Sequence, residues 1–440
     1  MYQILALIQL IILLVFLGYN LKTKGVIIFV DQVKIMFLLW IIALILYDLR
    51  LSSLYNPTIM VNGLVFLIWG SFLTLSKFKK LEEQDIIYTF EELKNKEHRK
   101  RYSVLANTIF IIGALVFVYN AYKYGLAILE ENKIDKQSMD HYSGYIVYML
   151  VLAAEIKYIL IRNFKKLGDI IVFFLCFIIL FLTLNRGPIA FLFITLGLYE
   201  VFNFINIKHT LSSKKKYLIY GGFIISIGAF ITFFGIIGNL RMEYVLKNVY
   251  DRTLWQHYGV GEYMPSGLLW VYIYLTSPLE NVAYSLGTQV VSYVYFNNLL
   301  YPFIKFFANL AGQGEVYKQW LINRGSYIPY LESRVGLNAG SFIPEAFQDF
   351  GVLGFLVYLL IYIIIAYMAI KLIKRKVGLS SISKILIYTN ITSLLIWSVF
   401  VNSFKMPILL MNIILLLFME WDNKKGFLKT LLRKLKSTKV

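Results

Sequence analysis

The chain has 440 residues, of which 59% are hydrophobic, 17% aromatic and only 16% charged. Soluble globular proteins carry about 45–50% apolar and about 25% charged residues, so the composition excludes an ordinary soluble enzyme. The net charge of +19 comes from 44 Lys and Arg residues against 25 Asp and Glu residues. On a soluble chain that excess would suggest nucleic acid, but in a membrane protein basic residues mark the cytoplasmic side. We therefore expect a membrane protein with membrane lipids, and no nucleic acid, among its partners.

Continuous apolar runs follow one another along most of the chain. A membrane span needs about 20 mostly apolar residues, and a bilayer core accepts only helices or closed barrels. The runs are continuous rather than alternating, which indicates helices. They predict an all-α polytopic membrane protein with about eleven transmembrane helices, within a range of about 10 to 13. The predicted spans are 2–19, 33–48, 58–75, 104–121, 144–161, 169–184, 188–206, 216–238, 351–370, 383–402 and 406–420.

The basic residues of the connections gather on one side of the predicted bundle. That side includes the segment 77–101, the turn at 208–216 and the tail from Lys424 to Lys439. The positive-inside rule places it in the cytoplasm, which puts the N-terminus outside and the C-terminus inside. The single cysteine, Cys176, lies inside an apolar run, so the chain holds no disulfide of its own.

The segment 239–350 is the one long interruption between apolar runs, and the same rule places it outside the cell. The chain thus divides into transmembrane helices over 1–238, a large extracytoplasmic loop over 239–350, and further transmembrane helices with a basic cytoplasmic tail over 351–440. The loop contains two aromatic-rich stretches, 266–286 and 290–310, both interrupted by Pro or polar residues. Such composition suits re-entrant or interfacial helices, and we predict a lid on the outer surface. Two additional spans are the alternative, because they would leave the sides unchanged.

Two arginines stand where predicted helices reach the outer surface. Arg186 precedes Gly187 and Pro188, which favour close backbone approach and a helix start. Its charge and the helix N-terminus both favour an anion. Arg241 follows the outer end of the span 216–238, and a guanidinium matches phosphate oxygens. The pair is a candidate clamp for a diphosphate; the alternative is that Arg186 anchors its turn at the membrane surface.

Further candidates lie near the end of the long segment. Arg324 and Arg334 either add to a diphosphate or sugar site or form structural ion pairs. Ser341 is a candidate helix cap, and Glu345 and Asp349 then share one helix face because they are four residues apart. Two such carboxylates repel each other, which raises the pKa of one towards that of a useful base. The alternative is that they only pair with the arginines.

Several functional classes lack their residues in this sequence. No Asp-x-Asp or His-rich cluster occurs in the predicted outer loops, so we expect no metal and no other cofactor. A P-loop is also missing, which excludes a nucleotide-driven protein of that type. His141 and His257 are isolated, and we expect no catalytic role for them. Glu155 and Lys157 are unusual charged residues within a span, and we expect them to reach the nearby inner surface.

The sequence resembles the bacterial O-antigen and capsule repeat-unit polymerases (Wzy-type). The resemblance rests on Arg186 and Gly187 at the outer end of a mid-chain helix and on Arg241 just before the large loop. It also rests on YLTSPLENV inside that loop and NAGSFIPEAFQDFGVLGF at its end. The similarity covers about 186–354; elsewhere the chain matches only as hydrophobic spans.

This resemblance implies a GT-C-like helical bundle in the bacterial cell membrane, related to the O-antigen ligases. It implies transfer of a growing glycan from undecaprenyl diphosphate onto a lipid-linked repeat unit outside the cell, with a chain-length regulator as a further candidate partner. The family's diphosphate-binding arginines correspond to Arg186 and Arg241, and more loosely to Arg334. Ligases tend to carry His where this chain has Asn338, which weakens the ligase alternative; Asn338 and Gly187 are further candidates for substrate contact. A flippase or transporter of lipid-linked oligosaccharides is the remaining alternative.

Overall fold

The computed structural model describes residues 1–78, 81–91, 93, 96–129, 141–288, 293–324, 331–374 and 379–425. The regular structure of these residues is helical, and β pairing among them is limited to two isolated bridges, Ser52 with Val260 and Ser341 with Val401. The basic tail predicted after α18 lies largely outside the described residues, which end at Lys425.

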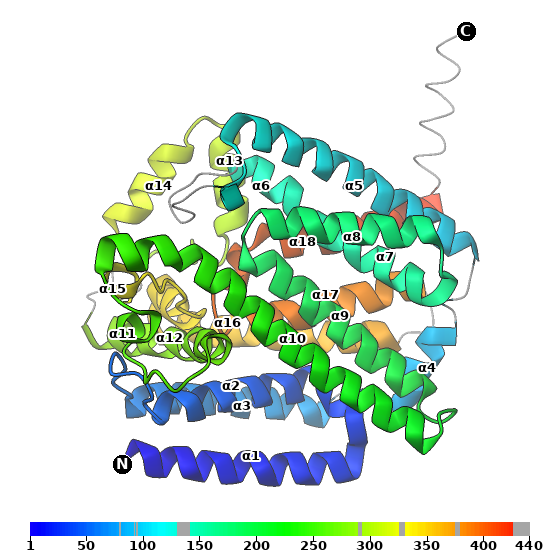
Figure 1. The fold of residues 1–440 in the computed structure, drawn as a ribbon. Helices are drawn as coiled ribbons and strands as arrows, with labels where there is room; N and C mark the ends of the chain where they lie inside the picture. Colours follow the sequence, from blue (N-terminus) through cyan, green and yellow to red (C-terminus); the bar gives the residue numbers. More distant parts are fainter. Residues whose placement is uncertain are drawn as a thin grey trace.

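The predicted apolar spans fall on long helices (Figure 1). These are α1 (Tyr2–Lys24), α2 (Gln32–Asp48), α3 (Ile59–Phe78), α5 (Lys96–Tyr124), α6 (His141–Tyr148), α7 (Leu150–Phe164), α8 (Leu167–Leu182), α9 (Arg186–Ile207), α10 (Ser213–Val245), α16 (Ile343–Lys374), α17 (Ser381–Trp397) and α18 (Pro407–Lys425). The predicted span 144–161 is divided between α6 and α7. The other helices are α4 (Glu83–Glu91), α11 (Leu254–Tyr258), α12 (Ser266–Thr288), α13 (Tyr301–Leu310), α14 (Gly314–Asn323) and α15 (Glu332–Val335).

Six helical segments of the described chain are long and apolar enough to cross a membrane. They are Tyr2–Phe29, His98–Tyr124, Ser143–Phe164, Arg186–Ile207, Ser213–Tyr250 and Ile343–Lys374. Four shorter apolar helices accompany them, at Ile59–Leu75, Leu167–Leu182, Ser381–Trp397 and Leu410–Trp421. The chain is therefore a helical protein with several membrane-length helices, whereas the predicted count of eleven stays a prediction.

The bundle has two distinct ends (Figure 1). The N-terminus, α11, α14 and α15 lie at one end, which we call the loop end. The short helix α4 and the turn between α9 and α10 lie at the other, which we call the α4 end. This agrees with the prediction that the N-terminus and the segment 239–350 share one side. Which end faces the outside of the cell stays a prediction.

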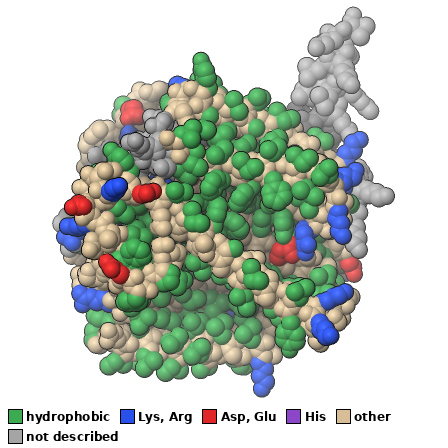
Figure 2. Space-filling model, viewed as in Figure 1, with side chains coloured by type: hydrophobic (Ala, Val, Ile, Leu, Met, Phe, Trp, Pro, Cys, Tyr) green, Lys and Arg blue, Asp and Glu red, His purple; other side chains and the backbone are tan. Residues whose placement is uncertain are grey.

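The face of the bundle in Figure 2 is largely hydrophobic in its middle, with most Lys and Arg side chains near the two ends. Large apolar side chains are exposed on the outward surfaces of several long helices. Examples are Leu7, Ile11, Leu14, Ile111, Leu115, Leu218, Ile224, Ile225, Leu356 and Leu360. A soluble monomer rarely exposes such continuous apolar surface, whereas a lipid-facing surface requires it.

The structure places α12 inside the bundle, whereas the sequence predicted that this stretch forms a lid on the outer surface. α12 packs against α2, α3, α10 and α16, and Trp270, Ile273 and Asn281 on it are almost fully buried. The later helix α13 differs, because none of its residues is buried. Trp270 and Tyr272 of α12 are buried among other helices, which composition alone did not reveal.

Two charged residues of α7 are also buried, contrary to the expectation that they reach the surface. Glu155 and Lys157 are each only 1% exposed. The ammonium of Lys157 lies 2.6 Å from the Asp169 carboxylate of α8, and Asn390 of α17 donates to Glu155 at 2.9 Å. Both partners lie on other helices, and Asn390 is also far from Glu155 in the sequence, so a single apolar run could not predict them.

Candidate functional site

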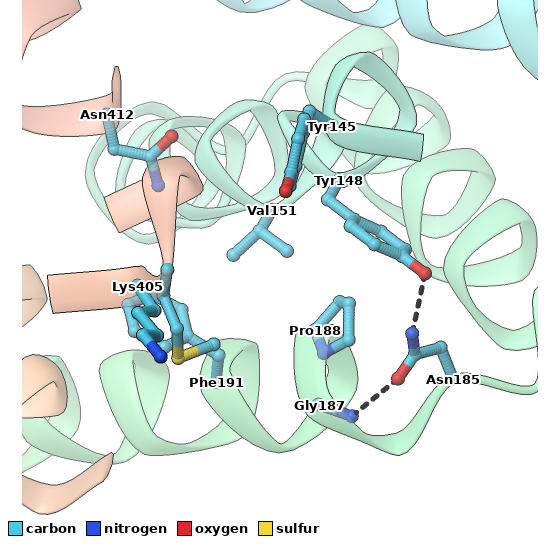
Figure 3. A pocket seen from close by; sticks show the side chains of 10 residues that line it. Tyr145, Tyr148, Val151, Asn185, Gly187, Pro188, Phe191, Lys405 and Asn412 are labelled. Carbon is cyan, nitrogen blue, oxygen red and sulfur yellow. Dashed lines mark hydrogen bonds between the residues drawn. The ribbon is translucent and has the colours of Figure 1, made fainter. Parts of the chain in front are cut away.

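Arg186 begins α9 at the loop end, and the local sequence holds it there. Asn185 caps the helix, because its Oδ1 accepts from the N–H of Gly187 at 3.2 Å. Its Nδ2 donates to the Tyr148 hydroxyl at 2.6 Å, which joins this turn to α6 (Figure 3). Pro188 suits the first turn, where its missing N–H costs no hydrogen bond. The predicted helix start at this position is confirmed.

Aromatic rings of α10 and α12 enclose the guanidinium of Arg186. Its Cζ lies 4.6 Å from the ring centre of Trp270, 4.7 Å from Tyr274 and 5.4 Å from Phe234. Cation–π contacts of this kind contribute about 0.5–2 kcal/mol. Yet Nε and Nη1 of Arg186 are buried without a hydrogen-bond partner among the described residues. An unsatisfied buried donor costs about 1–3 kcal/mol, so an acceptor bound beside Arg186 would remove that cost.

Close contact between α10 and α12 puts these rings in place. The indole N–H of Trp270 donates to Asn239 Oδ1 at 2.8 Å. Gly238 lies against the same indole: a Cβ at this position would stand 2.4 Å from Trp270 Cε2. A side chain at Gly235 would meet the backbone of Gly267 at 2.7 Å. Glycine is required at such contacts because any side chain would separate the helices.

Arg186 and Arg241 line the same cavity, of about 340 Å³. Arg241 comes from the last turns of α10. Trp270 and Tyr274 of α12 form another part of the lining, and residues 335–337 complete it at the loop end. We call this space the arginine cavity. The two arginines that the sequence singled out are thus brought together, as a diphosphate clamp requires.

His257 also lines the arginine cavity and is 3% exposed, so it is neither isolated nor on the surface. A capping box built from Thr253 and Gln256 starts α11 and presents His257. Its Nε2 lies 3.3 Å from the Val335 carbonyl, which makes Nε2 the protonated nitrogen. Burial lowers the pKa of His257, and Arg252 adds to the effect against the opposing hydrogen bond to Val335. The imidazole is therefore neutral at pH 7.

The remaining predicted arginines and Asn338 do not line this cavity. Arg334 lies on α15 and is exposed, next to Val335, which does line the cavity. Arg324 directly follows the end of α14, and its guanidinium donates to the Tyr293 carbonyl at 3.3 Å. Asn338 is exposed in the loop before α16.

Gly187 faces a second cavity, of about 210 Å³ (Figure 3). Asn185 and Gly187 line it while Arg186 lines the arginine cavity, so the first turn of α9 lies between the two. The opposite wall carries Lys405 from the connection between α17 and α18, together with Asn412 of α18. We call this space the second cavity.

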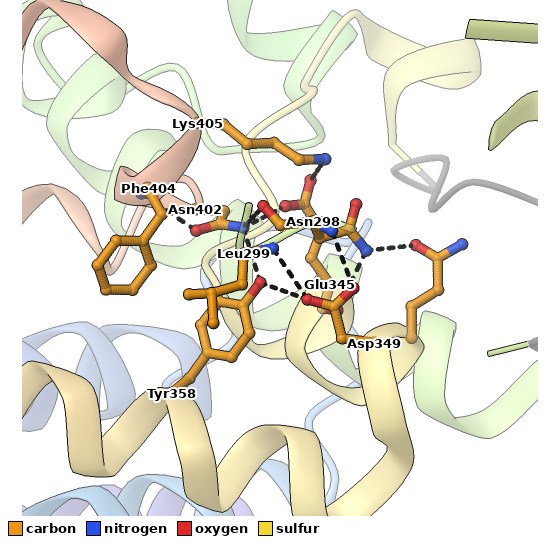
Figure 4. Close-up of polar contacts among 9 residues, drawn as sticks. Asn298, Leu299, Glu345, Asp349, Tyr358, Asn402, Phe404 and Lys405 are labelled. Carbon is orange, nitrogen blue, oxygen red and sulfur yellow. Dashed lines mark hydrogen bonds and ion pairs between the residues drawn. The ribbon is translucent and has the colours of Figure 1, made fainter. Parts of the chain in front are cut away.

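Glu345 and Asp349 belong to a polar network beside Lys405 (Figure 4). One oxygen of Glu345 is 3.0 Å from the Lys405 ammonium, and the other accepts from Asn402 at 2.7 Å. Neither carboxylate has an ion pair with the predicted arginines among the described contacts. Glu345 is therefore placed near the second cavity through Lys405.

Asp349 has a different environment from Glu345. It is fully buried, and its carboxylate accepts from the backbone N–H groups of Asn298 and Leu299 at 2.9 and 3.0 Å. The Tyr358 hydroxyl donates to it at 2.7 Å (Figure 4). These contacts fasten the chain at 298–299 onto α16 and occupy the carboxylate. Of the two predicted carboxylates, Glu345 is the better placed for proton transfer.

Glu345 and Asp349 lie on one face of α16, as predicted, because the helix begins at Ile343 and includes both residues. Ser341 Oγ accepts from the N–H of Ile343 at 3.0 Å, so Ser341 bonds to the first residue of α16 from two positions before it, although it does not occupy the predicted cap position. The helix bends just after Asp349, where Gly351 has φ +60°. This left-handed conformation suits glycine, so the chain can redirect α16 past the network.

Sequence reasoning missed His257 and Lys405 as site residues. A signal for Lys405 was present, since it is a cation between two predicted spans on the same side as Arg186. His257 gave no local signal, because its partners come from α10, α12 and residues 335–337. Among the described residues, no group of three or more His, Cys, Asp and Glu side chains is arranged to hold a metal ion.

Comparisons with known proteins give no relative: no family model, no curated protein and no solved structure matches the chain.

Proposed function

We propose that this protein is a membrane glycosyltransferase that polymerises glycan repeat units carried on a polyprenyl diphosphate. The growing glycan moves from its undecaprenyl diphosphate carrier onto a lipid-linked repeat unit at the outer face of a bacterial cell membrane. The observation that carries the proposal is the pair Arg186 and Arg241 in one cavity, with two buried nitrogens of Arg186 that have no hydrogen-bond partner in the described part of the chain.

Diphosphate chemistry fits the arginine cavity. A guanidinium offers paired N–H donors that match phosphate oxygens, and two of them balance the charge of a diphosphate. The aromatic enclosure excludes water around Arg186, which strengthens electrostatic attraction to the leaving group. Fixed cations of this kind stabilise negative charge that develops in the transition state without a metal ion.

The reaction is a substitution at the anomeric carbon of the donor sugar. A hydroxyl oxygen of the acceptor forms the new glycosidic bond while the carbon–oxygen bond to the diphosphate breaks. The bonding electrons leave with the diphosphate, which the arginines receive. The hydroxyl proton passes to Glu345. This carboxylate pairs with Lys405, and Lys405 lines the second cavity. Donor and acceptor thus meet at the first turn of α9.

Replacement of either arginine tests the proposal. Arg186→Gln and Arg241→Gln should each lower the polymerisation rate by about 10²–10³-fold, the usual effect of removing one preorganised donor to a developing anion. The measurement is the glycan chain-length ladder of cells, with the amount of inserted protein determined in parallel.

The matched control is Arg50→Gln, which removes an exposed arginine bonded to Asn56 that does not line the cavity. It should leave the ladder unchanged. A normal ladder in either Arg186→Gln or Arg241→Gln would contradict the proposed mechanism.

A flippase or transporter is the second candidate function, favoured by the buried charges of Glu155, Lys157 and Asp169. Intramembrane ionisable residues often mark transport pathways. The glycan that accumulates on deletion separates the two: single repeat units outside the cell support a polymerase, and units trapped inside support a flippase. Long chains that stay unattached to their final acceptor would support a ligase.

A further inference from the structure

The second cavity contains a buried hydrogen-bond acceptor without a partner. Asn412 is fully buried, and its Nδ2 donates to Asn390 Oδ1 at 3.1 Å. The Oδ1 of Asn412 has no hydrogen-bond partner among the described residues. Asn412 lies at the wall of this cavity (Figure 3). The site therefore presents an acceptor that a ligand donor would satisfy.

The orientation of this amide is fixed by the groups behind it. Asn390 donates through its Nδ2 both to Glu155 Oε2 and to the Leu386 carbonyl, each at 2.9 Å. Its Oδ1 is then the atom left to accept, which requires Asn412 to turn its Nδ2 inwards. The Asn412 oxygen is consequently the amide atom left to accept from a donor at the cavity wall. Buried Glu155 accepts from Asn390 and so fixes the orientation of Asn390 and, through it, of Asn412; the proposed mechanism does not use Glu155 in any other way.

The rest of the lining narrows the chemistry of the ligand. Phe191, Pro188 and Val151 supply apolar surface, and Tyr145 directs its hydroxyl towards the centre (Figure 3). Lys405 supplies N–H donors from the opposite wall. Apolar walls with a few well-placed donors and acceptors are typical of sites for small polar organic ligands.

Other ligand classes fit less well. An acyl or isoprenoid chain carries no donor for Asn412 Oδ1. A phosphate is an acceptor like Asn412 Oδ1, and the charge of Lys405 is already balanced by Glu345 at 3.0 Å. A sugar ring has hydroxyls that donate and accept, and C–H faces that pack on aromatic rings. At about 210 Å³, the cavity is smaller than the about 300–1,000 Å³ of drug-sized sites, which suits a single ring.

We propose that the second cavity binds one sugar ring of the glycan, with a ring hydroxyl donating to Asn412 Oδ1 and Lys405 donating to a ring oxygen. The inference rests on the proposed function for the identity of the glycan. It assigns the acceptor sugar to one side of the first turn of α9 and the diphosphate to the other. The hydroxyl that reacts would then lie next to the Glu345–Lys405 pair.

Photo-crosslinking tests this assignment in the full-length protein within its native cells. Phe191 is replaced by p-benzoylphenylalanine in cells fed a radiolabelled sugar precursor, and the purified chain is assayed for sugar label after irradiation. Phe193→p-benzoylphenylalanine is the matched control. Phe193 lies on α9 like Phe191, but it packs against Phe177 of α8 and Phe230 and Phe233 of α10 and does not line the cavity. Val151→p-benzoylphenylalanine provides a second position in the cavity.

We expect sugar label on the two cavity variants and none on the Phe193 variant. Absence of sugar label at both cavity positions, in variants that still polymerise, would overturn the assignment; so would an adduct that contains phosphate or lipid but no sugar. In addition, Asn412→Leu should raise the apparent KM for the lipid-linked substrate by about tenfold, the effect of one hydrogen bond. An unchanged KM would also overturn it.

The two proposals fail separately in these experiments. Sugar crosslinks at Phe191 together with a normal ladder in Arg186→Gln would remove the diphosphate mechanism and leave the sugar site. Loss of the ladder in Arg186→Gln without sugar crosslinks would remove the sugar site alone.

Discussion

At the scale of single residues, desolvation sets the properties of the arginine cavity. Arg186 keeps a charge among aromatic rings, while His257 gives up its charge because burial makes the protonated form costly. An anion bound in the cavity would instead favour the protonated form of His257. It satisfies the free N–H groups of Arg186 and attracts a proton to His257, whose Nδ1 is buried without a partner among the described residues.

Diphosphate binding should therefore take up a proton at His257. Burial holds the pKa of His257 below its ordinary value when no anion is bound, and a bound anion raises that pKa. Affinity therefore increases as the pH falls from the pKa of the bound state towards the pKa of the free state. The increase reaches at most about tenfold per pH unit for one proton. Calorimetric titration with farnesyl diphosphate from pH 8 to pH 6 measures it.

His257→Gln is the control for this pH dependence, because it keeps a polar side chain that does not titrate. Subtracting its profile removes the titration of the ligand itself. Tyr250, Tyr258, Arg186, Arg241 and Arg252 are the other titratable or charged groups near His257, and they are retained in the variant. Equal pH dependence in both proteins would show that His257 takes up no proton.

At the scale of elements, the contact between α10 and α12 supports the site. The glycines of this contact bring the helices close enough for Trp270 and Tyr274 to reach Arg186. Other glycines of α10, such as Gly228, have open space around them. Position on the helix, rather than the residue type, thus decides which glycine the site depends on.

Gly238→Ala should destabilise the protein by about 1–3 kcal/mol, the usual cost of forcing extra volume into a packed contact. The added Cβ would stand 2.4 Å from the Trp270 indole, so the ring must move away from Arg186. We expect a lower thermal unfolding temperature in detergent and a weaker glycan ladder.

Gly228→Ala is the matched control within α10, since nothing lies within 4 Å of its Cβ position. It should be neutral or slightly stabilising, because alanine favours helix by about 1 kcal/mol over glycine. If both variants behave alike, close packing at Gly238 has no special importance.

At the scale of the whole molecule, the two ends of the bundle have different roles. Both cavities are lined from the loop end, by the start of α9, the last turns of α10 and the connections that precede α16 and α18. The α4 end carries Lys208, which pairs with Glu83, and the basic start of α10. The positive-inside rule then predicts that the cavities open outside the cell.

Single introduced cysteines can test this orientation, because the natural Cys176 is buried. Glu262→Cys places a thiol at the exposed loop end, and Lys215→Cys places one in the exposed first turn of α10. A membrane-impermeant maleimide should label the Glu262 variant in intact cells and the Lys215 variant only after permeabilisation. The opposite pattern would place the arginine cavity in the cytosol and exclude the proposed reaction.

The sequence by itself predicted the features that depend on neighbouring residues. Apolar runs predicted the long helices, Pro188 lies in the first turn of α9 as its chemistry requires, and a spacing of four put Glu345 and Asp349 on one face. Such features are local, because a helix satisfies its own backbone in lipid and its ends need nearby caps.

Only the tertiary structure decided which side chains meet. It buried α12 in the bundle, gave Glu155 and Lys157 partners from other helices, and separated Glu345 from the arginines. It also placed His257 in the same cavity as Arg186 and placed Asn412 at the wall of the second cavity. Apolar periodicity says that a helix is buried but not against which neighbour, since packing between helices depends on the shapes of residues far apart in the chain.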